Sequence, residues 1–198
     1  MEFTEALRGR RMVRSYRPDP VAEDVLGRVV RMVHRAPSGG FSQGHRLVVI
    51  TAPEPRRRIA EISERPYGER GFPAWISKAP VHLALGVREA SYHERYQQPD
   101  KLDADGAEIA WPVPYWWFDS GALLTLIQLA AADEGLATGF FGPDPQRLAE
   151  LRATVGFPDD VALAGIVTLG YGAEEPDDRS SRTTRARLPL DELVTWVR

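Results

Sequence analysis

Apolar and polar positions recur with two different periods along the chain, and each period predicts a different kind of element. Helical spacing predicts helices at 2–10, 21–36, 53–65 and 144–156, with Asp144 and Pro145 at the start of the last one and Gly156 after its end. Apolar, β-rich runs predict strands at 46–51, 79–87 and 161–172, with a short extended segment at 138–142. A closing helix or extension is expected at 188–197.

The segment 119–137 carries the strongest helical signal, and Gly135 ends it. It is apolar on almost every side, which is typical of a helix buried in a core or an interface. Asp119 stands at its start and is predicted to be the N-cap.

Residues 88–118 show no clean period and are rich in aromatic residues and proline. We predict a lid or a substrate-binding loop here, because long segments of this kind are usually functional. The rest of the chain has neither an internal repeat nor a linker, so 1–198 is expected to form one domain. Helices and strands do not alternate regularly, which favours an α+β fold over a doubly wound one.

Composition excludes several classes of function. The net charge is −3, so no overall field attracts nucleic acid or an anionic membrane. No apolar run reaches the ~20 residues that span a bilayer. The chain has no cysteine, which excludes disulfides, thiolate nucleophiles and cysteine-bound metals. The four histidines lack metal-ligand spacing, so no metal site is expected. The absence of cysteine is compatible with a reducing compartment, and we expect a cytoplasmic location.

Residues 40–44 read Gly-Phe-Ser-Gln-Gly, which matches the G-x-S-x-G of serine hydrolases. In a nucleophile elbow the serine follows a strand and precedes a helix. Ser42 stands in the reverse order, after a predicted helix and before a predicted strand. We therefore do not expect Ser42 to be a nucleophile, and no residue of the chain is predicted to be catalytic.

A different pattern suggests a phosphorylated planar ligand. Arginines crowd both ends of the chain, at 8–17 and 179–187, and guanidinium groups suit a phosphate. Gly39 and Gly40 allow the backbone to approach a flat ligand closely because they lack Cβ atoms. An arginine cluster is more often a solvated face than a phosphate clamp, and the pattern alone leaves both interpretations open.

The chain resembles the FMN-dependent nitroreductase family along nearly its whole length. The resemblance rests on five strings in the family's order: RRMVRSYRPDPV, RAPSGGFSQGHRLVVI, KAPVHLALGV, DSGALLTLIQLAAADEGLATGFFG and RARLPLDEL. It implies an α+β fold with a mainly antiparallel sheet flanked by helices, in an intertwined homodimer with two active sites at the subunit interface. It also implies FMN as cofactor, NADH or NADPH as hydride donor and a small electron-poor acceptor such as a nitroaromatic, a quinone or an enone.

The same resemblance assigns site residues. The FMN phosphate and ribityl chain would be held by Arg10, Arg11, Met12 and Arg14, with Arg185 and Arg187 closing from the C-terminal motif. Pro37, Ser38 and Gly39 would approach the isoalloxazine of the partner's cofactor. Phe141 and Gly142 would offer backbone amides to its N5 and O4, where the reduced flavin gains negative charge. Substrate contacts are expected from Phe41, Tyr115, Trp116 and Trp117, with packing in the dimer core as the alternative for the two tryptophans.

Two departures from the family pattern keep alternatives open. Met12 replaces a serine, and the loop 41–45 retains only Gln43 of the usual Asn-x-Gln-Pro-Trp. A flavin-binding protein without turnover, a flavin-consuming enzyme similar to the dimethylbenzimidazole synthase branch, a pathway-specific dehydrogenase and a deazaflavin enzyme therefore remain alternatives.

Overall fold

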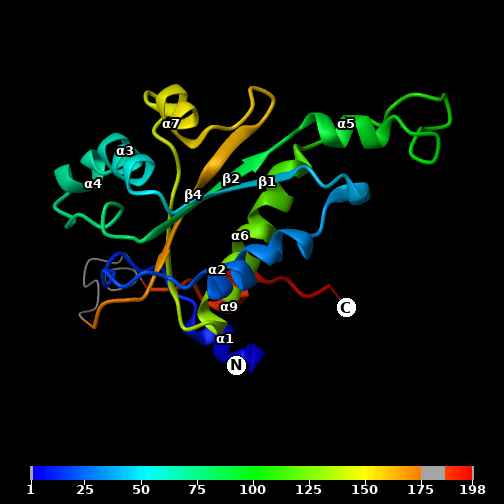
Figure 1. Ribbon diagram of the computed structural model, residues 1–198. Helices are drawn as coiled ribbons and strands as arrows, with labels where there is room; N and C mark the ends of the chain where they lie inside the picture. The colour runs from blue at the N-terminus through cyan, green and yellow to red at the C-terminus, as the bar shows by residue number, and fades with distance from the viewer. Residues whose placement is uncertain (1, 175–185, 198) are drawn as a thin grey trace.

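The computed structural model describes residues 2–174 and 186–197 (Figure 1). Its elements, in chain order, are α1 (Phe3–Gly9), α2 (Glu23–Val30), η1 (Arg31–His34), η2 (Gly39–Phe41), β1 (His45–Ile50), α3 (Pro53–Ser63), α4 (Arg65–Glu69), β2 (Val81–Val87), α5 (Ala90–Tyr96), α6 (Tyr115–Asp133), β3 (Ala137–Phe141), α7 (Leu148–Val155), β4 (Ala162–Gly170) and α9 (Leu190–Leu193).

The four strands of the described residues form one sheet in the order β1-β2-β4-β3, and every neighbouring pair is antiparallel. All seven residues of β2 are buried, as its unbroken apolar run requires of a central strand covered on both faces. The α+β class and the antiparallel sheet expected from the sequence are therefore confirmed.

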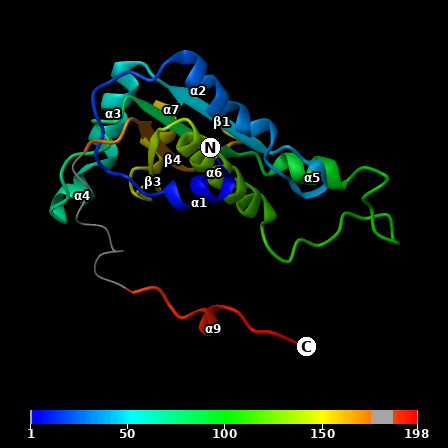
Figure 2. The same ribbon diagram turned by 90° about the horizontal axis from the view of Figure 1, so that it is seen from below.

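Helices cover both faces of the sheet (Figures 1 and 2). On one face α2 and α6 pack on the strands through a cluster that includes Leu26, Val29, Leu83, Ile127 and Val167. On the other face α3 and α7 pack through a cluster that includes Ile59, Ile62, Trp75, Leu151 and Ile166. Burial of these side chains, each worth about 1.5–3 kcal/mol, supplies most of the force that holds the three layers together.

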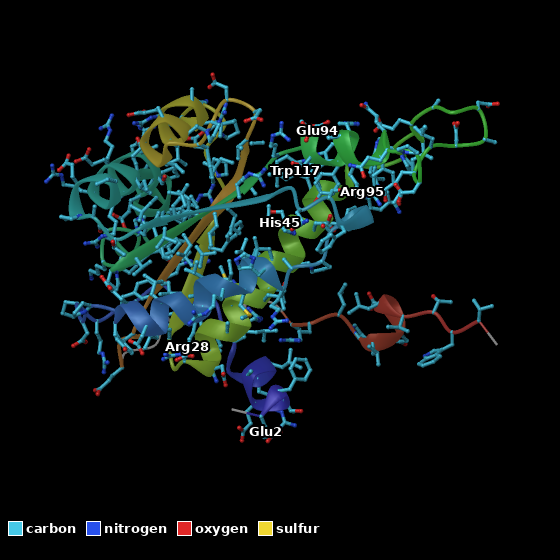
Figure 3. The ribbon with its side chains drawn as sticks, turned by 45° about the vertical axis from the view of Figure 1, so that its right-hand side comes forward. Glu2, Arg28, His45, Glu94, Arg95 and Trp117 are labelled. Carbon is cyan, nitrogen blue, oxygen red and sulfur yellow. The ribbon has the colours of Figure 1, made fainter. Side chains whose placement is uncertain are left out.

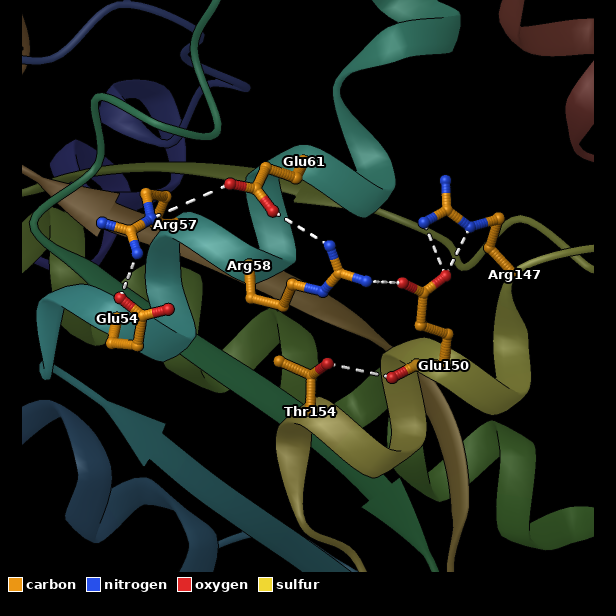
Figure 4. A network of polar contacts seen from close by, with 7 residues as sticks. All are labelled: Glu54, Arg57, Arg58, Glu61, Arg147, Glu150 and Thr154. Atoms are coloured by element: carbon orange, nitrogen blue, oxygen red, sulfur yellow. Dashed lines mark hydrogen bonds and ion pairs between the residues drawn. The ribbon is translucent and has the colours of Figure 1, made fainter.

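An ion-pair network joins α3 to α7 on the outer surface (Figure 4). Arg58 of α3 contacts Glu61 and, across the two helices, Glu150 of α7, which also pairs with Arg147. These side chains are partly or largely exposed, so solvent screens the pairs and they add little to stability.

The helix α6 begins at Tyr115, four residues earlier than expected, and Asp119 lies inside it. The prediction that Asp119 caps the helix is therefore wrong. Pro114 is the residue before the helix, and the aromatic residues 115–118 form its first turn. The first turn forms there because Trp116 packs against the rings of Tyr92 and Trp111.

The helix expected at 144–156 is also shorter than predicted. Residues 145–147 form a turn, in which Asp144 Oδ1 accepts the backbone N–H of Gln146 at 2.9 Å. The helix α7 starts only at Leu148, and Gly156 ends it with φ of 81°, as predicted.

Residues 88–118 include more regular structure than their sequence indicates. They contain α5 and the first turn of α6, joined by a long connection that projects from the body (Figure 1). Only Ser91 and Tyr92 of α5 are buried, so the helix has no apolar stripe that a periodicity could reveal. Its assignment as a lid stays a prediction.

The N-terminal arm runs along β3 after α1 ends. Met12 forms a parallel bridge with Thr138, and Val13 donates its backbone N–H to Thr138 at 2.8 Å. Further on, Tyr16 bridges Gly172 and its hydroxyl lies 2.7 Å from the hydroxyl of Thr168. These contacts fix the arginine-rich arm against the edge of the sheet.

Candidate functional site

The arginines of the N-terminal arm lie beside a small cleft of about 230 Å³. Its walls are the arm, the last turns of α6 and the start of β3, and they include Arg10, Arg11, Gln128 and Thr138. Gln128 is buried and its Nε2 lies 3.4 Å from Met12 Sδ, which places the methionine beside this wall residue. A cleft with guanidinium groups at its rim fits a phosphate.

Arg14 and Phe141 both contact one buried tryptophan, Trp75. The guanidinium carbon of Arg14 lies 5.6 Å from the ring centroid of Trp75, and the Phe141 ring packs edge-on against the same indole at 5.8 Å. Phe141 is buried, whereas Gly142 is exposed and a Cβ there would meet no atom within 4 Å. The structure thus brings the arm and the end of β3 together, with open space beside the Gly142 backbone.

The loop 37–44 lies at the other end of α6. Gly39 and Phe41 bound the short helix η2, and the left-handed region is adopted by Gly40, Phe41 and Gln43, with φ of 58°, 61° and 51°. A bulky residue such as Phe41 rarely adopts this conformation, which costs roughly 1–3 kcal/mol. Phe41 nevertheless exposes 73% of its surface, so the packing of its own side chain does not offset this cost.

The geometry around Ser42 does not resemble a catalytic triad. Its hydroxyl donates to the backbone carbonyl of Gly39 at 2.5 Å, and the nearby His45 contacts the carbonyl of Pro37 through Nε2 at 3.0 Å. Ser42 also precedes β1, as its sequence order indicates. Both side chains shape the loop.

Charged and aromatic side chains from α5 and α6 hold this loop. Asp119 Oδ2 accepts the backbone N–H of Gly39 at 3.0 Å and the hydroxyl of Tyr92 at 2.6 Å. Arg95 donates from Nε to the carbonyl of Gly40 at 2.9 Å. Burial, followed by the hydrogen bond to Asp119, strongly raises the pKa of Tyr92, so its hydroxyl stays protonated and donates.

Sequence reasoning did not assign Asp119, Tyr92 or Arg95 to the site. One signal was available: Asp119 is the only charged residue between 115 and 132, in an otherwise apolar helix. A carboxylate in that setting needs a partner, and its partner Gly39 lies 80 residues away in the sequence.

The aromatic residues expected to contact substrate separate into two groups. Trp116 is buried and packs between Tyr92, His93 and Trp111. Tyr115 and Trp117 are exposed, like Phe41. Figure 3 shows Trp117 and Arg95 near the first turns of α6, whereas Arg28 lies toward its other end.

The carboxylate of Glu108 bonds the long connection to α5, in a cluster with Trp111, Gln97 and His93 that we call the clasp. Glu108 accepts hydrogen bonds from Trp111 Nε1 at 2.6 Å, from Gln97 at 3.0 Å and from His93 Nδ1 at 2.6 Å. These donors lower the pKa of Glu108 to about 2. The bond to Glu108 also raises the pKa of His93, with a smaller contribution from Glu89.

The two groups of predicted site residues do not meet within one chain. The arm and the start of β3 line the cleft together with Gln128 in the second half of α6, whereas the loop 37–44 is bonded to Asp119 in its first half. Along the helix Asp119 and Gln128 are about 14 Å apart, at 1.5 Å per residue. Arg187 is exposed in the tail 186–197, which lies apart from the body (Figure 2), and Arg185 falls outside the described residues.

Within the described part of the chain, no group of three or more histidine, aspartate or glutamate side chains is arranged to hold a metal ion. Among the described helices, none combines the length and apolar character needed to cross a membrane.

Comparisons with known proteins agree with the fold and the motifs. The model of the nitroreductase family matches residues 7–171. A protein of Thermus thermophilus named NADH dehydrogenase is 30% identical over 98% of this chain and 94% of its own length. An FMN reductase [NAD(P)H] of Bacillus subtilis is 31% identical over 96% of this chain and 71% of its own.

A solved structure of a nitroreductase family protein from Clostridium difficile has a TM-score of 0.70 at 24% identity and covers 99% of this chain and 98% of its own. The family match confirms the resemblance seen in the sequence. It also confirms the expected enzyme class, an oxidoreductase that uses FMN with NADH or NADPH. The chain belongs to the nitroreductase family.

Proposed function

We propose that two copies of this chain form a homodimer with two shared active sites, in which a small electron-poor acceptor is reduced at the expense of NADH or NADPH. The observation that carries the proposal is the separation along α6 between the cleft, which reaches Gln128, and the loop, which is bonded to Asp119. One chain offers a cationic cleft without the loop beside it. A second copy can supply the loop to the cleft of the first, and symmetry then makes two sites.

The residues of the cleft fit the cofactor. Arg10, Arg11 and Arg14 would hold its phosphate, with Met12 beside Gln128 and with Arg185 and Arg187 closing from the tail. The backbone of Phe141 and Gly142 would face the ring system, where the space beside Gly142 is open. When bound, FMN supplies the transfer of a hydride between the nicotinamide donor and the acceptor. The protein needs no strong acid or base for this chemistry.

Exposed apolar side chains support the dimer. The tail 186–197 carries Leu190, Leu193 and Trp196, each at least 60% exposed. A groove of about 820 Å³ runs between α1, α2 and α6, and Phe3, Met32, Leu126 and Leu129 are among its lining residues. The groove is also lined by charged side chains, among them Arg28, Arg31 and Glu134, and exposed apolar side chains beside polar ones are a common feature of protein interfaces.

Pro37, Ser38 and Gly39 would approach the isoalloxazine of the partner's cofactor, and the acceptor pocket would be formed there by the aromatic side chains beside them. Phe41, Tyr115 and Trp117 are exposed and offer flat apolar surfaces to a ring. Nitroaromatics, quinones and enones have the electron-poor planar form that suits such a pocket. A cytoplasmic location, where the nicotinamide donors are produced, belongs to the same proposal.

Three measurements on the purified protein test the proposal. We expect a bound flavin released as FMN, a dimer in analytical ultracentrifugation, and steady oxidation of NADH or NADPH when menadione or nitrofurazone is added. A monomer that retains FMN would contradict the shared site. Bound FMN that neither nicotinamide reduces would instead favour a flavin-binding protein without turnover, the alternative that Met12 and the altered loop suggest.

Cofactor retention tests the cleft. Arg14→Ala and Arg187→Ala should each lower the FMN content after dialysis, because each removes a charge-assisted contact worth about 1.5–3 kcal/mol. Ser42→Ala is the control, since its hydroxyl contacts only the loop carbonyl. Full FMN content in both arginine variants would reject the assignment.

A further inference from the structure

Asp119 makes two hydrogen bonds through a single carboxylate oxygen. Its Oδ2 receives the backbone N–H of Gly39 at 3.0 Å and the hydroxyl of Tyr92 at 2.6 Å. The three groups come from η2, α5 and α6, which are distant in the sequence. A carboxylate that accepts two donors binds them more strongly than a neutral acceptor does.

The bonded loop is in a conformation that its own side chains do not favour. Gly40 and Phe41 are consecutive left-handed residues, with φ of 58° and 61°. Phe41 is exposed, so the contacts that hold it must act on the backbone around it. Inside the loop these are the bonds from Ser42 Oγ to the Gly39 carbonyl and from the Gln43 N–H to Ser38 Oγ.

Outside the loop, a charged side chain holds the backbone on each side of the turn. Asp119 binds the N–H of Gly39, and Arg95 binds the carbonyl of Gly40 while it pairs with both oxygens of Asp100. The ring of Tyr96 packs so close to Gly40 that a Cβ atom added there would lie only 2.7 Å from Cε2 of the tyrosine. The helix α5 therefore lies against the turn through Arg95 and Tyr96, and the bond from Tyr92 to Asp119 connects α5 to α6.

We propose that Asp119 is a positioning residue for the acceptor site, which it shapes by holding the Gly39 backbone and so directing the exposed ring of Phe41. The inference rests on the proposed function, in which this loop borders the acceptor. Asp119 touches neither the acceptor nor the cofactor, and its effect passes through the loop. Its loss should therefore weaken acceptor binding and leave cofactor retention and the maximal rate nearly unchanged.

Steady-state kinetics on the dimeric, FMN-loaded enzyme test this with menadione as the acceptor. Asp119→Ala should raise the KM for menadione about tenfold, the usual cost of a lost charge-assisted hydrogen bond, with kcat and FMN content within about twofold. Asp119→Asn keeps an acceptor oxygen and should restore most of the affinity. Tyr92→Phe removes only the second bond and should have an intermediate effect. Asp159→Asn, an exposed acid in the turn before β4, is the matched control.

A double variant separates positioning from general stabilisation. If Asp119 acts through Phe41, Phe41→Ala alone raises the KM, and adding Asp119→Ala raises it little further. Hydrogen exchange at the amides of residues 38–44 should accelerate in Asp119→Ala and in Tyr92→Phe, but not in Asp159→Asn.

Several outcomes would overturn the inference. An unchanged KM and unchanged loop exchange in Asp119→Ala would reject it, and so would fully additive effects in the double variant. If Asp119→Ala does not fold, Asp119→Asn and Tyr92→Phe decide the question alone. A parent enzyme that oxidises neither NADH nor NADPH rejects the proposed function and this inference together, whereas an active parent with unaffected variants rejects this inference only.

Discussion

At the scale of single residues, Phe41 combines backbone strain with an exposed ring. We expect Phe41→Gly to leave the free energy of unfolding unchanged or raise it by up to about 1 kcal/mol, because glycine adopts the left-handed region freely but loses more entropy on folding. The same variant should raise the KM for the acceptor. Urea unfolding and steady-state kinetics measure the two effects.

Phe41→Ala is the matched control for this prediction. It removes the same ring but keeps a Cβ atom in the left-handed region, so it should be less stable than Phe41→Gly with a similar KM. If the alanine variant were the more stable of the two, the backbone at this position would not be strained.

The buried imidazole of His82 should make stability depend on pH. Burial lowers its pKa from 6.5 to about 4, and its Nε2 lies 2.9 Å from the carbonyl of Ile76. Between these two values the unfolded chain binds a proton that the folded chain does not, so stability is complete above about pH 6.5 and falls as the pH is lowered toward 4. The difference corresponds to about 3 kcal/mol at most.

Urea titrations at pH 7, 5.5 and 4.5 measure this loss, and His82→Gln is the comparison, because glutamine keeps an N–H donor without titrating. The glutamine variant should show a flatter dependence over the same range. An equal slope in both proteins would assign the acid sensitivity to other groups.

At the scale of elements, the clasp between α5 and the long connection should loosen as the pH rises. The hydrogen bond to Glu108 raises the pKa of His93, so the charged pair is fully present below the ordinary histidine value and is lost as the pH passes the raised one. Glu108 remains ionised throughout, since its pKa is about 2.

We therefore expect hydrogen exchange in residues 97–114 to accelerate above neutral pH by more than the intrinsic chemical rate. Glu108→Gln should show fast exchange at every pH. A connection whose protection does not change between pH 6 and pH 9 would contradict the role of His93.

The same elements show what can be predicted from the sequence. The apolar run of α6 and the buried strand β2 were predictable because burial on several sides leaves a local pattern. The start of α6 was not, since Asp119 follows the residues 115–118 and looks like a cap while its partner Gly39 lies far along the chain. The helix α5 was missed because charged contacts such as those of Arg88 with Glu94 and Asp160, rather than an apolar stripe, surround it.

The candidate site was predictable to a similar extent. Family motifs indicated the arginine arm and the glycine loop, because close approach of backbone and phosphate restricts residue types. The supporting residues Tyr92, Arg95 and Asp119 follow only from three-dimensional contacts. The distance that α6 puts between the two groups has no sequence signature either.

At the scale of the whole molecule, the proposed sharing of sites predicts complementation between two defective proteins. Arg14→Ala damages the proposed phosphate site and Phe41→Ala damages the loop. In a mixed dimer one site combines both defects and the other has neither. After unfolding and refolding of an equal mixture, half of the dimers should be mixed, so about a quarter of the sites should be intact.

Menadione reduction by the refolded mixture measures this recovery, with each variant refolded alone as the control. Activity that stays at the sum of the two separate variants would show that cleft and loop act within one chain.

The pairing of the N-terminal arm with β3 has a consequence for solubility. β3 is an edge strand of the sheet, and Met12 and Val13 lie along its outer side at Thr138. Without the arm, unpaired N–H and C=O groups would face other molecules and invite strand addition. Removing residues 2–16 should thus cause concentration-dependent aggregation, measured by light scattering, in addition to loss of the flavin. The segment that we assign to phosphate binding therefore also protects the protein against aggregation.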